Sequence, residues 1–224
     1  MLDVLPSRRG TQDPFWGWPD VATLRTFLWV GTAGAIWFAL IYGGADAVTS
    51  RRTFRVAVHF EAEKVIPAIP AAVWAYMSIY ALFLMGPFVL RSSRRLIALG
   101  AALAAVALVA GIGFVLFPAE LVYPVPVDAS GPGATGDVYR FADWLNLEHN
   151  LLPSLHVALS VTCIGAYATR AGRVGQLLLW IWGVAVALST IFTHFHHVLD
   201  AVTGFALGLA GALIYRRMGE GENG

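Results

Sequence analysis

Long uncharged apolar runs alternate along the chain with short polar segments. Four runs reach the length of about 20 mostly apolar residues that a helix needs to cross about 30 Å of hydrocarbon: Thr26–Ala45, Ala71–Leu90, Leu96–Phe117 and Gly175–Thr193. Two shorter runs, Leu155–Thr169 and Ala201–Tyr215, can each be extended at their start by residues that include a His or an Asp. Arginine follows both of them, and its stem can lie along apolar surface. The pattern predicts an all-α membrane bundle of about six transmembrane helices.

The overall composition fits a membrane protein rather than a water-soluble domain. Of the 224 residues, 58% are hydrophobic and only 13% are charged, whereas a soluble domain carries about 25% charged residues. The formal net charge of +1 gives no reason to expect a nucleic-acid partner. We predict a cytoplasmic N-terminal segment at residues 1–25, a transmembrane domain at residues 26–217 and a frayed tail at residues 218–224.

The basic residues are distributed unequally between the two sides of such a bundle. If the N-terminus is cytoplasmic, ten of the 15 basic residues fall on the cytoplasmic side: Arg8, Arg9, Arg25, Arg91, Arg94, Arg95, Arg170, Arg173, Arg216 and Arg217. The other five fall outside: Arg51, Arg52, Arg55, Lys64 and Arg140. Because cytoplasmic loops are enriched in Lys and Arg, both termini are predicted to be cytoplasmic. Four of the outer basic residues share the first outer loop, which suggests that this loop binds anions.

Three segments are predicted to lie on the outer side. Asp46–Pro70 mixes basic and apolar residues, and we expect an amphipathic helix in the headgroup layer. Pro118–Pro153 begins with a Pro/Gly-rich loop, Tyr123–Gly136, and continues with a short helix at Asp137–Leu147. The third segment is Thr193–His197. Every histidine lies in these segments or at the adjoining helix ends: His59, His149, His156, His194, His196 and His197. Ionisable groups at membrane depth are costly, so this clustering indicates a functional site.

The segment Leu152–His156 has the composition of a helix start at the membrane surface. Proline suits the first turn, because the N–H that it lacks would be unpaired there. We therefore expect a helix to begin near Pro153, with Ser154 and His156 in its first turn. The free N–H groups and partial positive charge of a helix start favour a phosphate. Ser154 adds a hydroxyl donor and His156 a proton donor, although an ordinary helix cap with an interfacial histidine has the same pattern.

The segment Ser189–Asp200 combines three histidines with a carboxylate close to the hydrocarbon. On a helix, His196 and Asp200 share one face because they are four residues apart. A carboxylate that holds one imidazole nitrogen leaves the other basic, as a nucleophile or base requires. His197 is the competing choice, whereas His194 should point elsewhere. A polar interfacial patch with a structural aspartate is the alternative, but an aspartate at this depth needs a partner.

Three segments are similar to the motifs of one enzyme family: Ile66–Pro70, Asn150–Ala158 and His196–Gly204. On these segments the chain resembles the membrane branch of the type 2 phosphatidic acid phosphatase (PAP2) superfamily, near its inositol phosphotransferase and inositolphosphorylceramide synthase-like members. The resemblance covers roughly residues 60–215. It implies that His156 is the general acid, that His196 is the nucleophile and that Asp200 is the partner of His196.

Two departures from the family pattern concern phosphate binding. The first motif of the superfamily ends in Arg-Pro, but no such pair follows Lys64, and the third usually begins Ser-Arg where this chain has Ser189-Thr190. The inositolphosphorylceramide branch also tends to lack these arginines. The candidates to replace them are the outer basic residues Arg51, Arg52, Arg55, Lys64 and Arg140. We assign substrate binding to Ser154 and Lys64.

The leading interpretation is an enzyme that acts on lipid phosphates through a phosphohistidine, without metal or another cofactor. It would be a phosphatase if water is the acceptor and a phosphotransferase if a hydroxyl is. The expected partners are a lipid phosphate or phospholipid substrate and membrane lipids. We expect the protein in the cell (inner) membrane, with the active site on the non-cytoplasmic side. The alternatives are a zinc-dependent membrane hydrolase, because the clustered His and Asp side chains are possible zinc ligands, and a non-enzymatic lipid transporter.

Overall fold

The computed structural model of the protein describes residues 14–123, 133–147 and 149–220. This part of the chain is helical, apart from loops and one isolated bridge between Val56 and Ala119. The prediction of an all-α bundle is thus confirmed. The elements are α1 (Val21–Thr49), η1 (Glu61–Val65), η2 (Pro70–Ala72), α2 (Val73–Met77), α3 (Ile79–Leu90), α4 (Ser93–Leu116), α5 (Ala134–Leu145), α6 (Leu155–Ala168), α7 (Arg173–Phe192) and α8 (Val198–Glu220).

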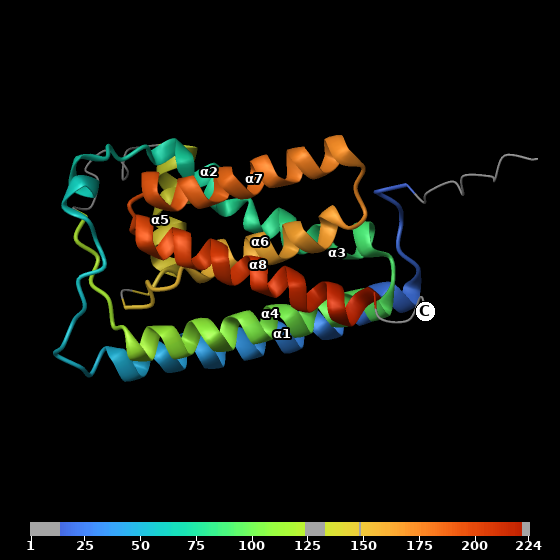
Figure 1. Cartoon of the computed structure of the whole chain (residues 1–224), viewed down its shortest axis with the longest axis horizontal. Coiled ribbons are helices and arrows are strands. Elements are labelled where there is room, and N and C mark those ends of the chain that lie inside the picture. The colour runs from blue at the N-terminus through green and yellow to red at the C-terminus, as the bar shows by residue number, and fades with distance from the viewer. Residues whose placement is uncertain (1–13, 124–132, 148, 221–224) are drawn as a thin grey trace, which may run out of the picture.

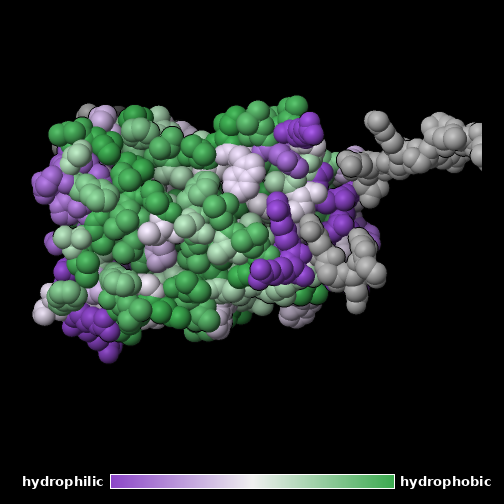
Figure 2. All heavy atoms as spheres, in the orientation of Figure 1, coloured by the Kyte–Doolittle hydropathy of each residue, from purple (hydrophilic) through white to green (hydrophobic). Residues whose placement is uncertain are grey.

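Five helical segments are long and apolar enough to cross a membrane: Val21–Thr49, Pro70–Leu90, Ser93–Leu116, Arg173–Phe192 and Val198–Gly219. The shorter apolar helix α6 lies among them (Figure 1). Apolar residues cover most of the middle of the face in Figure 2, whereas hydrophilic residues gather towards its two ends. An apolar band between polar ends is the surface expected of a protein that spans a bilayer, and the chain is an integral membrane protein.

Helix α1 begins and helix α8 ends at the same end of the bundle, and α5 and the loop after α1 lie at the opposite end (Figure 1). Helix α1 runs beside α4 along one edge, while α6 and α8 form the packed centre. Helices α6 and α8 lie close together because small residues of α8 face α6. A Cβ added at Gly208 would lie 2.6 Å from Val161 Cβ, and one at Gly204 would lie 2.4 Å from the Ser154 carbonyl oxygen. The small-residue stripe of α8, which contains Gly204 and Gly208, therefore brings the start of α6 against the start of α8.

The predicted amphipathic helix at Asp46–Pro70 is wrong. Helix α1 continues to Thr49, and the next residues are non-helical up to the short η1. Val56 N–H donates to the Pro118 carbonyl at 2.9 Å, and Val58 packs in a small buried cluster with Ala119. The apolar residues at 56, 58 and 60 follow the period of two of an extended chain, not the period of a helix.

Other element boundaries are close to those expected. Helix α1 starts at Val21, before Thr26, because Asp20 caps it and accepts a hydrogen bond from Thr23 N–H at 2.7 Å. Helix α5 confirms the short helix predicted near Asp137–Leu147. In the second span, Ser78 separates α2 from α3, and its hydroxyl accepts a hydrogen bond from Trp182 Nε1 at 2.7 Å. Helix α8 continues to Glu220, and most of the predicted loop Tyr123–Gly136 lies outside the described residues.

Candidate active site

His156 lies in the first turn of α6 and is held by Tyr76 of α2. The two rings stack with centroids 3.7 Å apart, and His156 Nε2 lies 2.7 Å from the Tyr76 carbonyl oxygen. Because a carbonyl only accepts hydrogen bonds, Nε2 carries a proton, and in the neutral ring Nδ1 is the basic nitrogen. The Tyr76 ring is fixed in turn, since its hydroxyl donates to Asn146 Oδ1 at 2.7 Å.

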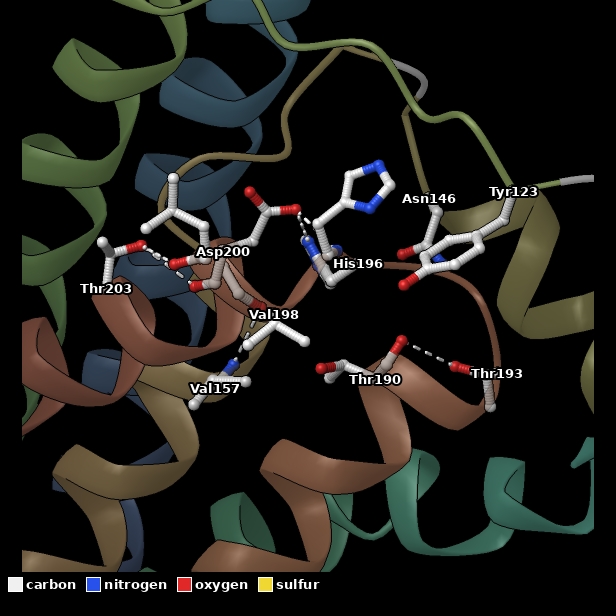
Figure 3. A network of polar contacts seen from close by, with 12 residues as sticks. Tyr123, Asn146, Val157, Thr190, Thr193, His196, Val198, Asp200 and Thr203 are labelled. Carbon is white, nitrogen blue, oxygen red and sulfur yellow. Dashed lines mark hydrogen bonds and ion pairs between the residues drawn. The ribbon is translucent and has the colours of Figure 1, made fainter. Parts of the chain in front are cut away.

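His196 lies in the turn between α7 and α8, beside the carboxylate of Asp200 (Figure 3). His196 Nδ1 is 3.5 Å from Asp200 Oδ2, and the two residues are 6% and 0% exposed. The pairing confirms the predicted neighbours, but not the common helix: α8 begins at Val198, so His196 precedes it. With Nδ1 turned towards the carboxylate, Nε2 is the nitrogen left for chemistry.

The turn that carries His196 is fixed by its backbone. The Thr190 carbonyl, near the end of α7, accepts hydrogen bonds from the N–H groups of Phe195 and His196 at 3.1 and 3.0 Å. His194 has a φ of 60°, the left-handed conformation that often ends a helix but is uncommon for residues other than Gly and Asn. The Tyr139 hydroxyl of α5 donates to the Thr193 carbonyl at 2.6 Å. These contacts fix the backbone that carries the imidazole of His196.

Asp200 connects the starts of α6 and α8. Its Oδ2 accepts from His197 N–H at 2.9 Å, and its carbonyl accepts from Ser154 N–H at 2.9 Å. Within the described part of the chain, Asp200 Oδ1 and His196 Nδ1 are buried and have no hydrogen-bond partner. Buried polar atoms are nearly always satisfied, and exceptions often lie at functional sites. A small rotation of the imidazole would bring Nδ1–H into hydrogen-bonding distance of the carboxylate.

His197 has surroundings of a different kind, built around Glu63 of η1. His197 Nδ1 is 3.0 Å from Glu63 Oε2, and its Nε2 faces Val122 N–H at 3.4 Å. The same Oε2 accepts from Val198 N–H at 3.1 Å and from the Tyr123 hydroxyl at 3.0 Å. Both nitrogens of His197 are therefore engaged, and the ring is fully buried. His197 is a poor candidate for the nucleophile.

Glu63 was not identified by the sequence analysis. Its side chain is 3% exposed, and its Oε1 accepts from Phe60 N–H at 3.2 Å. Burial alone would raise the pKa of this carboxyl, but the hydrogen bonds from Val198, Phe60, Tyr123 and His197 outweigh it and lower the pKa below its ordinary value. Glu63 is therefore an anion that joins the loop after α1 to the turn before α8. The pattern Glu-Ala-Glu-Lys around it gave no sign of burial.

The remaining predicted residues lie at the same end of the bundle with other partners. His194 Nε2 is 3.0 Å from the Ile66 carbonyl, so the ring does point away from Asp200. Ser154 is the N-cap of α6, and its Oγ accepts from Val157 N–H at 3.4 Å.

The basic candidates for substrate binding have partners of their own. Lys64 Nζ forms an ion pair with Glu61 at 2.8 Å, and its side chain is 47% exposed. The Arg55 guanidinium contacts His149 Nε2 at 3.2 Å. Substrate binding by Ser154 and Lys64 stays a prediction.

An apolar cavity of about 470 Å³ reaches the two candidate catalytic histidines. His156 and His196 line one end of it together with Tyr76, Asn146 and Asn150. Most of the rest is lined by apolar residues of α1, α3, α4 and α6. A concave apolar pocket with a few convergent polar groups is the usual form of a ligand site.

The clustered side chains do not form a group of metal ligands. Within residues 14–123, 133–147 and 149–220, no three His, Cys, Asp or Glu side chains are placed to hold one metal ion. His194 and His197, two of the possible zinc ligands, are directed to Ile66 and Glu63.

Comparison with known proteins gives one family. The model of the PAP2 superfamily matches residues 124–223, a range that contains His156, His196 and Asp200 but not Lys64 or Glu63. No curated protein and no solved structure matches the chain. PAP2 superfamily members are generally phosphatases. The match covers less than half of the chain, and over that range the chain is similar to the PAP2 superfamily.

Proposed function

We propose that the protein transfers the phosphoryl group of a lipid phosphate through a phosphohistidine on His196. The observation that carries the proposal is the meeting of His156 and the His196–Asp200 pair at one end of an apolar cavity. This arrangement supplies a nucleophile, its orienting carboxylate, a proton donor and room for an apolar substrate within a single site.

The first half-reaction uses the two histidines on opposite sides of the phosphorus. His196 Nε2 attacks, an N–P bond forms and the bond from phosphorus to the lipid oxygen breaks. The oxygen leaves with the bonding electron pair and takes a proton from Nδ1 of His156, the nitrogen not bound to the Tyr76 carbonyl. The negative charge of a nearby phosphate favours the protonated form of His156 that this step requires. Asp200 stabilises the positive charge that develops on the His196 ring.

The second half-reaction reverses the proton transfer. His156 accepts a proton from the incoming hydroxyl, whose oxygen forms a bond to phosphorus while the N–P bond breaks. Water as acceptor makes the enzyme a phosphatase. A hydroxyl such as that of inositol makes it a phosphotransferase, as the resemblance to the inositol phosphotransferase-like branch suggests.

The phosphate itself is proposed to sit at the start of α6. A helix N-terminus carries a partial positive charge and free N–H groups, and Ser154 caps this one. Lys64 would contribute by exchanging its ion pair with Glu61 for the phosphate, a small cost because exposed ion pairs are weak. We place this site on the non-cytoplasmic side of the cell membrane, following the distribution of basic residues.

Turnover of lipid phosphates by detergent-purified protein, with and without inositol, tests the proposal. We expect release of phosphate or formation of an inositol phosphate, and a phosphohistidine on His196 after a quench that avoids acid. Activity should survive EDTA. Loss that only added zinc restores would favour the metal-dependent hydrolase, and binding of lipid without any turnover would favour the transporter.

A further inference from the structure

The apolar cavity extends far beyond the histidines. On α1 its lining runs from Tyr42, near the polar end, to Phe27, a distance of about 22 Å at 1.5 Å per residue. This is a large part of the about 30 Å thickness of the hydrocarbon layer. At the far end, Phe27, Gly86 and Leu96 come together: a Cβ added at Gly86 would lie 3.5 Å from Leu96 and 3.9 Å from Phe27. The cavity is thus long, and Phe27, Gly86 and Leu96 lie together at its far end.

The contents of this cavity follow from its lining. An apolar cavity without polar partners does not hold ordered water, and the walls away from the histidines are apolar side chains and glycines. Helix α1 packs along α4 (Figure 1), and its residues Gly31, Gly34 and Ala35 face the cavity. A hydrocarbon chain that enters from the bilayer is the occupant that this lining accepts.

We propose that the cavity holds one long hydrocarbon chain of the lipid phosphate and sets the length of chain that the enzyme accepts. The inference rests on the proposed function for the position of the phosphate, beside His156 and His196. A chain that moves from the bilayer into an apolar cavity gains no hydrophobic energy, because lipid is already apolar. Discrimination between chains must therefore come from packing against the walls and against the side chains at the far end.

Gly34 gives a direct way to shorten the cavity. It lines the cavity, and an added Cβ would meet no other atom within 4 Å, so a larger side chain would project into open space without displacing its neighbours. Gly34 is about 12 Å along α1 from Tyr42. Leucine also favours the helix more than glycine does. Gly43 of the same helix is the matched control, because its added Cβ also meets nothing but Gly43 does not line the cavity.

The test compares kcat/KM for hexadecyl phosphate and octyl phosphate in the wild type, Gly34→Leu and Gly43→Leu. We expect Gly34→Leu to lose at least about tenfold on the long chain, the discrimination that a single methylene can produce in a tight pocket. Its activity on octyl phosphate, and both activities of Gly43→Leu, should stay close to those of the wild type. Equal losses on both substrates, or no loss on either, would overturn the inference.

A binding experiment separates this inference from the proposed chemistry. Hexadecyl phosphate with a diazirine at the end of the chain is photo-crosslinked to the His196→Ala protein, and the modified residues are mapped by mass spectrometry. We expect labelling around Phe27 and Leu96, and its loss from these residues when Gly34→Leu is added. Such labelling without turnover by the wild type would contradict the proposed function but support the hydrocarbon chain in the cavity. Turnover by the wild type with labelling at other residues would support the proposed function but contradict the chain in the cavity.

Discussion

At the scale of single residues, the two adjacent histidines before α8 have opposite surroundings. His196 lines the cavity and has one nitrogen directed to Asp200. His197 is fully buried, with both nitrogens next to partners of its own. A nucleophile needs a basic nitrogen that can reach the substrate. His196 lines the cavity in which the substrate is proposed to bind, whereas His197 does not. Sequence spacing allowed either residue, since both lie within one helical turn of Asp200.

Substitution of the histidines should separate these roles. His196→Ala should abolish turnover, because no N–P bond can form. His194→Asn should keep most of the activity, since asparagine tolerates the left-handed backbone at this position. His156→Ala should lose about 10² to 10⁴-fold with an alkyl phosphate, the usual contribution of acid–base catalysis, and less with a phenyl phosphate, whose leaving group departs without a proton. Steady-state rates with both substrates check this, and activity of His196→Ala would contradict the assignment.

Glu63 is predicted to position the turn rather than to touch the substrate. Glu63→Gln should reduce the free energy of unfolding by about 2 kcal/mol at neutral pH, since it removes hydrogen bonds to a buried anion. The pKa of Glu63 is lowered in the folded protein, so this contribution is complete above the ordinary value of 4.5 and is lost as the pH falls through the folded value. The difference from the wild type should therefore disappear in acid.

Thermal unfolding in detergent as a function of pH measures this difference. Glu61→Gln is the matched control in the same η1 turn, because the Glu61 side chain is 81% exposed and its ion pair with Lys64 is worth little. A positioning role also predicts that Glu63→Gln lowers kcat more than it changes KM. Equal stability losses in both variants, or a difference that persists in acid, would refute the account.

At the scale of elements, the site depends on how closely α6 and α8 approach. Ser154 and His156 belong to the start of α6, Asp200 to the start of α8, and Gly204 and Gly208 allow the two helices to touch. The small-residue stripe of α8 and the helix start near Pro153 were both visible in the sequence. The distance between His156 and the turn before α8 could not be predicted from the sequence, because it depends on how α6 and α8 pack.

Insertion of a single methyl group should disturb this contact. A Cβ at Gly208 would lie 2.6 Å from Val161 Cβ and 2.7 Å from the Ala158 carbonyl oxygen, so Gly208→Ala must push α6 and α8 apart. Overpacking of this kind costs about 1–3 kcal/mol, and we expect a lower midpoint of unfolding together with slower turnover. Gly219→Ala on the same helix is the control, because its Cβ would make ordinary contacts at 3.6 Å. Equal behaviour of the two variants would contradict this role of Gly208.

The elements that sequence reasoning missed share a physical cause. Apolar runs identify spans because helices satisfy their own backbone groups in hydrocarbon. Five of the six predicted runs each lie on one helix to within a residue, and Ala71–Leu90 continues through η2, α2 and α3. Outside the hydrocarbon no such constraint acts. There, Val56 and Val58 form an extended segment against Ala119, and Glu63 is buried by contacts with residues far along the chain. Local pattern carries no signal for contacts of this kind.

At the scale of the whole molecule, all the candidate chemistry lies at one end of the bundle. In the described part of the chain, α6 and the five long segments run between the two ends of the bundle, so that α1 begins and α8 ends at the opposite end (Figure 1). The distribution of basic residues predicts that the termini are cytoplasmic. The catalytic end would then face outwards, and a lipid phosphate would need to reach the outer leaflet before it is consumed.

Cysteine labelling tests this orientation. Ala134 at the start of α5 and Gly172 between α6 and α7 are exposed and lie at opposite ends of the bundle. The native Cys163 is fully buried and should stay unlabelled. In intact cells a membrane-impermeant maleimide should modify Ala134→Cys, and it should reach Gly172→Cys only after the membrane is opened. The reverse pattern would place the catalytic end in the cytoplasm and show that the basic residues of the first loop, rather than those near the termini, determine the orientation. Those loop residues would then act as the cytoplasmic anchor of the bundle, and their proposed attraction for phosphate would lose its support.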